Sequence, residues 1–121
     1  MKFTKKQIER YSRQIILKKI GVIGQKKLLK SSVLIVGAGG LGSPIAIYLT
    51  ALGIGKIGII DKDNIEISNL SRQIIFSTND IKKSKSSTAI SKLKKINPDI
   101  QFKSFNKKLT KKNINPIAKN F

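Results

Sequence analysis

The sequence contains neither cysteine nor histidine among its 121 residues. These absences exclude a thiol nucleophile, a disulfide framework, an imidazole base and a zinc site built from cysteine or histidine. No apolar run is long enough to span a bilayer, and the first residues lead into a polar segment rather than the apolar part of a signal peptide. Any chemistry must therefore come from carboxylates, lysine, arginine, hydroxyls and the backbone, and we expect no membrane partner.

Negative charge is also scarce, with six Asp and Glu against 25 Lys and Arg and a formal net charge of +19. Such a charge can indicate nucleic-acid binding. Here the excess is almost all lysine, scattered over an Ile-, Lys- and Asn-rich chain, so we favour a solvated surface and consider a nucleic-acid partner unlikely. The same bias is typical of an AT-rich genome and favours synthesis in a plastid or in a bacterial cytoplasm.

Arginine is rare against this lysine background. The three arginines are Arg10, Arg13 and Arg72. A guanidinium offers a planar fork of donors that matches two phosphate oxygens at once, which an ammonium does not. Half of the acids lie together in residues 61–66. These exceptions to the composition are our candidates for phosphate and ribose contacts.

A glycine-rich turn organises the chain. An apolar run at residues 33–36 leads into Gly37-Ala-Gly39-Gly40-Leu-Gly42 and a helical pattern, and a second apolar run at 56–60 ends on Asp61. This is the order of a mononucleotide-binding half-fold, whose glycines allow a tight turn, close approach of a phosphate and close helix packing. The acid follows at close to the roughly 20 residues expected for a ribose contact. We therefore favour nucleotide binding over a purely structural turn.

The pattern predicts an α/β fold with a partial Rossmann-like, doubly wound parallel sheet of about three strands. The strands are expected at residues 33–36, 56–60 and 100–105, and the helices at 4–11, 25–30, 43–52 and 81–96, with at best a short helix in 109–120. Thr4 with Gln7 reads as a capping box, and Asp80 as the cap of the helix at 81–96. Residues 1–30 would form an N-terminal helical arm and residues 31–121 the nucleotide-binding domain.

Five motifs together resemble the MoeB/ThiF/HesA adenylyltransferases, relatives of the ubiquitin-activating enzymes. They are Arg10-Tyr-Ser-Arg13-Gln, the glycine-rich turn with its strand, Asp61-Lys-Asp63, Ser68-Asn69-Leu-Ser-Arg72-Gln73 and Ile96-Asn97-Pro98. The resemblance covers nearly the whole chain but only about the N-terminal half of the family's adenylation domain. Lys83 stands where the family usually has glycine.

The resemblance implies use of ATP and Mg to adenylate the C-terminal glycine carboxylate of a ubiquitin-like sulfur-carrier protein, most simply in molybdopterin biosynthesis. It places the nucleotide near Gly37, Gly39, Gly40, Gly42, Asp61, Asp63 and Asn69. It assigns catalysis to Arg72 and Lys85, which face the phosphates, and to Arg13, which enters the partner's site in a homodimer. The family's Mg-binding aspartate is expected on a strand after Phe121, so we expect no metal ligand within these residues. With the following strands missing, residues 33–36 would form a sheet edge.

Other interpretations stay open at this stage. The carrier could be that of thiazole synthesis for thiamine, or the chain could be a nucleotide-binding remnant without turnover. A nicotinamide dehydrogenase half-domain shares the glycine turn and the acid but has no need of the segment at 68–72.

Overall fold

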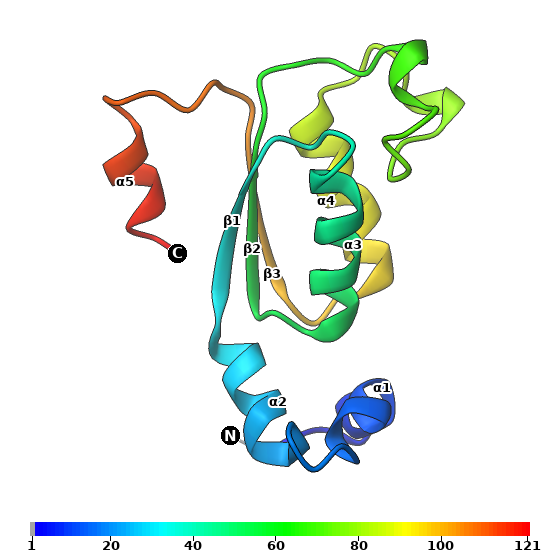
Figure 1. Cartoon of the computed structure of the whole chain (residues 1–121), viewed down its shortest axis with the longest axis vertical. Coiled ribbons are helices and arrows are strands. Elements are labelled where there is room, and N and C mark those ends of the chain that lie inside the picture. The colour runs from blue at the N-terminus through cyan, green and yellow to red at the C-terminus, as the bar shows by residue number, and fades with distance from the viewer. Residues whose placement is uncertain (1) are drawn as a thin grey trace.

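The computed structural model describes residues 2–121, and its centre is a parallel sheet of three strands (Figure 1). The strands are β1 (Ser32–Val36), β2 (Lys56–Ile60) and β3 (Gln101–Phe105), in the order β1-β2-β3. Val36 lies beside Ile60, and Ile60 beside Phe105, so the strands end level with one another. The loops that follow β1 and β2 therefore meet at the carboxyl end of the sheet. The predicted α/β class and the three strands are confirmed.

Helices cover both faces of the sheet, as expected for a doubly wound arrangement. Figure 1 shows α3 (Gly42–Leu52) and α4 (Lys85–Ile96) on one face and the short α5 (Ile114–Ala118) on the other. Ile57 and Ile59 of β2 are fully buried in one core cluster with Ala89 and Leu93 of α4. The opposite face of β2 is covered by the C-terminal residue, because a Cβ on Gly58 would collide with the ring of Phe121.

The N-terminal segment forms α1 (Lys5–Ile15) and α2 (Gly21–Lys30), at the end of the sheet away from the glycine turn (Figure 1). The capping box of Thr4 and Gln7 is present as predicted. Tyr11 is fully buried, and its hydroxyl accepts a 2.8 Å hydrogen bond from Nδ2 of Asn97, the residue that ends α4. This buried polar contact fastens α1 to the domain.

The helix predicted at 81–96 is shorter than expected, and its cap is a different residue. It begins at Lys85 and is capped by Ser84, while Asp80 ends a short 3-10 turn, Thr78–Asp80, and caps that turn together with Ser77. Lys82 separates the two elements with a positive φ of 71°, which no α-helix allows. The residue with the left-handed backbone conformation that favours glycine is Lys82, the neighbour of Lys83.

β1 lies at the edge of the sheet, as predicted, and within residues 2–121 it pairs only with β2. Its last residue, Val36, is 62% exposed. An exposed apolar edge strand presents unpaired backbone groups to other chains.

None of the helices in residues 2–121 combines the length and apolar character that crossing a membrane requires.

Candidate functional site

The glycine turn follows β1 directly and is held against the neighbouring strand. The Gly37 amide donates to the carbonyl of Ile60, the last residue of β2, at 2.9 Å. Gly37 has a φ of +93°, a backbone conformation that residues with a side chain rarely adopt. A Cβ on Gly42 would overlap the Gly37 carbonyl oxygen, so the start of α3 packs directly onto the turn. Open space remains around Gly37, and at Gly39 a Cβ would meet its nearest atom at 3.9 Å.

Asp61 joins this turn to the loop after β2. One carboxylate oxygen accepts from the Ala38 amide at 2.9 Å, and the other accepts from the Asp63 amide at 2.8 Å. Backbone donors therefore fix the orientation of the side chain at the carboxyl end of the sheet. Each oxygen keeps lone-pair capacity for a further donor, such as a ribose hydroxyl.

The segment that carries Asn69 and Arg72 lies against the turn. Asn69 accepts from the Glu66 amide at 2.8 Å and so closes a 3-10 turn, Ile67–Asn69. Arg72 donates from Nη1 to the Ser68 carbonyl at 3.0 Å, and its Cγ would be 3.7 Å from a Cβ on Gly40. The exposed guanidinium is thereby held beside the glycines.

Lys85 is the first residue of α4 and adjoins the same loop. Its amide donates to the carbonyl of Asp63 at 3.0 Å. The residue is only 7% exposed, yet within residues 2–121 no carboxylate lies within 4.0 Å of its ammonium. A side-chain cation that has no counterion within the described residues can pair with an anion, so Lys85 is a candidate for a phosphate contact.

Arg13 is not brought to this place. It is an exposed residue of α1, at the opposite end of the sheet from the glycine turn (Figure 1). Within one chain Arg13 therefore does not approach the glycine turn, and its predicted contribution to a partner's site stays a prediction. The other N-terminal arginine, Arg10, donates to the carbonyl of Ile96 at 2.9 Å and helps to attach α1 to α4.

The sequence reasoning assigned no role to Gln73, which the structure places over the turn. Its side chain is 5% exposed, and its Nε2 would be 3.9 Å from a Cβ on Gly39. Its Oε1 is buried without a hydrogen-bond partner in residues 2–121. The signal in the sequence was its place at the end of the motif Ser68-Asn69-Leu-Ser-Arg72-Gln73.

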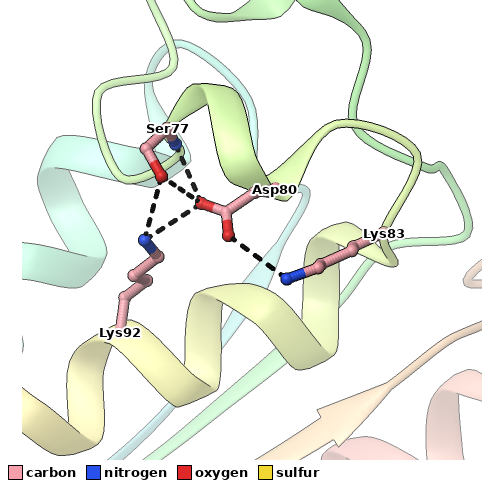
Figure 2. Close-up of polar contacts among 4 residues, drawn as sticks. All are labelled: Ser77, Asp80, Lys83 and Lys92. Atoms are coloured by element: carbon pink, nitrogen blue, oxygen red, sulfur yellow. Dashed lines mark hydrogen bonds and ion pairs between the residues drawn. The ribbon is translucent and has the colours of Figure 1, made fainter.

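Asp80 belongs to a separate polar cluster on the outer side of α4, shown in Figure 2. Its carboxylate accepts from the amide and hydroxyl of Ser77 at 2.8 and 2.9 Å and pairs with Lys92 at 3.0 Å. Burial raises the pKa of Asp80, but the hydrogen bonds from Ser77 and Lys92 and the charge of Lys92 outweigh burial and leave the pKa below its usual 3.8. Both oxygens of the Asp80 carboxylate thus have partners within the chain, and the contact with Lys92 fastens the loop to α4.

Carboxylates do not gather into a metal-binding group in the part of the chain that the structure describes. Within residues 2–121 no three His, Cys, Asp or Glu side chains are placed to hold a metal ion together. The predicted nucleotide-binding residues, by contrast, converge from four segments of the chain. The structure brings together the turn at 37–42, Asp61 with Asp63, Asn69 with Arg72, and Lys85.

Comparison with known proteins agrees with this arrangement. The chain matches the ThiF family over residues 11–121. It is 48% identical over 119 residues to a probable molybdopterin-synthase adenylyltransferase of Porphyra purpurea, covering 98% of this chain and 31% of that protein. It is 50% identical over 101 residues to a sulfur carrier protein ThiS adenylyltransferase of Escherichia coli, covering 84% of this chain and 40% of that protein.

A solved structure is similar to this chain in both fold and sequence. The crystal structure of E. coli MccB with ATP superimposes with a TM-score of 0.80 at 32% identity, covering 89% of this chain and 33% of MccB. The chain thus spans less than half the length of these three proteins. Because the family match includes every strand and the whole glycine-turn site, the chain belongs to the ThiF family.

Proposed function

We propose that this chain is the N-terminal part of an ATP-dependent adenylyltransferase that activates the C-terminal carboxylate of a ubiquitin-like sulfur-carrier protein. The observation that carries the proposal is that the glycine turn, the fixed carboxylate of Asp61, Arg72 and the start of α4 with Lys85 lie together at the carboxyl end of the sheet. The names of the sulfur-carrier adenylyltransferase relatives support the class of reaction.

The residues present fit a nucleotide. The turn leaves open space at Gly37 and Gly39 for a phosphate, and the 11-residue α3 directs its unpaired N–H groups and positive dipole end at the turn. Asp61 is oriented to accept from ribose hydroxyls. The Lys85 ammonium and the Arg72 guanidinium supply positive charge to the phosphates.

These residues address the electrostatic difficulty of the reaction. A carboxylate that attacks the α-phosphate brings two anions together, and negative charge then builds on the departing pyrophosphate. Arg72 and Lys85 would neutralise that charge, with little reorganisation because the one is held by Ser68 and the other is buried. Loss of one well-placed donor in such a site costs about 3 kcal/mol of barrier, or roughly a hundredfold in rate.

Mg accompanies ATP in our proposal, and a magnesium ion bound to nucleotide phosphates needs only one or two protein carboxylates. Such an ion would help to neutralise the phosphates. Both oxygens of the Asp61 carboxylate accept from backbone amides. In our proposal the residues described here supply the nucleotide contacts, and the magnesium ion arrives with the ATP.

We propose the carrier of molybdopterin synthesis as the partner, with the thiazole carrier ThiS as the alternative. The match to the molybdopterin-type relative extends over more of this chain than the match to the ThiS-type relative. A homodimer in which Arg13 enters the partner's site, and synthesis in a plastid or a bacterial cytoplasm, complete the proposal. The lysine-rich composition and the red-algal relative support the plastid.

Exchange of radiolabelled pyrophosphate into ATP tests the reaction. The wild-type chain should catalyse exchange with the molybdopterin-type carrier, or with ThiS if the alternative holds, and the same carrier without its C-terminal glycine should give none. Arg72→Ala should lower the rate about a hundredfold. Lys94→Ala is the matched control for the loss of a cation, because Lys94 is exposed in the last turn of α4, away from the glycine turn, and its removal should leave the rate unchanged. Absence of exchange with both carriers would contradict catalysis by this chain.

A second candidate function uses the same contacts. In this alternative the glycine turn, Asp61 and Arg72 hold a nucleotide without turnover. ATP would then raise the melting temperature, and Arg72→Ala would abolish that rise, while no pyrophosphate exchange occurs with any carrier.

A further inference from the structure

Gln73 is a buried amide whose hydrogen-bonding capacity the chain does not use fully. Its backbone is committed to the local turn, because the amide donates to the Asn69 carbonyl at 2.8 Å and the carbonyl accepts from the Phe76 amide at 3.1 Å. The side chain adds nothing to that turn through Oε1, which is buried with no partner in residues 2–121. A buried acceptor left without a partner costs about 1 to 3 kcal/mol. Such a group requires an explanation.

The position of the amide supplies one. Consecutive residues of one segment lie over consecutive glycines, with Arg72 against Gly40 and Gln73 against Gly39. Nε2 would be 3.9 Å from a Cβ at Gly39, so the donor end of the amide faces the backbone at which the phosphate is expected. Gln73 is therefore both 95% buried and directed at the glycine turn, a combination that a solvated surface glutamine does not show.

We propose that Gln73 is a nucleotide-contacting residue, in which Nε2 donates to a phosphate oxygen held over Gly39. The inference rests on the proposed function and adds a residue to that site. An uncharged amide has a distinct use beside Arg72 and Lys85, because it can donate to the phosphate without adding charge to the site.

Two substitutions separate this role from a structural one. Gln73→Glu keeps the shape but replaces the donor by a carboxylate, and Gln73→Met keeps the approximate volume without any polar atom. Dissociation constants for ATP and for adenosine, which has no phosphate, should be measured on the 121-residue chain by calorimetry, with melting temperatures of each variant. Gln101→Glu is the matched control for charge, since Gln101 is an exposed residue at the start of β3, at the other end of the sheet.

Gln73→Glu should weaken ATP binding about tenfold or more, since it removes a hydrogen bond to a charged group and adds repulsion. Adenosine affinity should change by less than about twofold, and Gln101→Glu should leave ATP binding within about twofold of wild type. Gln73→Met should also weaken ATP binding and should melt no lower than wild type, because it removes the unsatisfied acceptor. If Gln73→Glu fails to fold, Gln73→Met alone decides.

Three results would overturn the proposal. Wild-type affinity for ATP in both variants would show that Gln73 makes no contact with the nucleotide, while leaving the proposed function intact. Equal losses for ATP and adenosine together with lower melting temperatures would show a structural role. Failure of the wild-type chain to bind ATP would remove the proposed function itself and this inference with it.

Discussion

Gly42 offers the sharpest test of how the turn is built. A methyl group at this position would lie closer than 3.0 Å to the carbonyl oxygen of Gly37, which is backbone and cannot rotate aside. Overpacking of this kind costs about 3 kcal/mol, and the better helix propensity of alanine returns about 1 kcal/mol at the start of α3. The expected net loss for Gly42→Ala is therefore about 2 kcal/mol, or about 8 °C in melting temperature for a chain of this size.

Gly40→Ala is the matched control within the same turn. There the new methyl group would be 3.7 Å from Cγ of Arg72, which is ordinary contact, and the φ of Gly40 is not positive. Its melting temperature should stay within about 2 °C of wild type or rise slightly. Thermal unfolding followed by circular dichroism measures both variants. Equal melting temperatures for the two would refute the close packing of α3 on the Gly37 carbonyl.

Three further predictions concern residues outside the glycines. Lys82→Gly should raise stability by about 1 kcal/mol in urea unfolding, because Lys82 has a φ of +71° that glycine adopts without strain, and an unchanged midpoint would contradict that backbone geometry. Because folding lowers the pKa of Asp80, its contribution to stability should be complete above its ordinary value of 3.8 and should disappear as the pH falls through the lower folded value. The stability gap between wild type and Asp80→Asn, from urea unfolding at several pH values, should therefore narrow below that pH, and a constant gap would refute the ionised pair with Lys92. Lys85→Met should weaken ATP binding in calorimetry about tenfold or more, because it removes a cation that has no carboxylate partner within residues 2–121, and should leave the melting temperature close to that of wild type. A lower melting temperature with unchanged ATP affinity would show instead that Lys85 is structural.

Local sequence signals predicted much of the fold because the physics behind them is local. The capping box at Thr4 and Gln7 spans one helical turn, and the alternating run of β3 needs only its own residues to be recognised. The glycine turn was recognisable for the same reason, since Gly37 and Gly42 meet within six residues. The parallel order of the three strands follows from the helices between them.

The remaining features depend on competition or on contacts between distant residues. Asp80 could cap either the helix predicted at 81–96 or a turn before it. It caps the 3-10 turn together with Ser77, because the positive φ of Lys82 interrupts the helical backbone before α4 begins. The bond between Tyr11 and Asn97 joins residues 86 positions apart. The burial of Lys85 and Gln73 likewise depends on how loops pack together, which no pattern in the sequence reveals.

The central claim is that four separate segments form one nucleotide site. Hydrogen exchange of the backbone amides, measured by mass spectrometry with and without saturating ATP, tests this claim most directly. We expect ATP to slow exchange in residues 37–42, 61–63 and 68–73 and at Lys85, and to leave β3 and α5 unchanged. Unchanged exchange in all four segments, or protection confined to the later, lysine-rich turns of α4, would contradict the account.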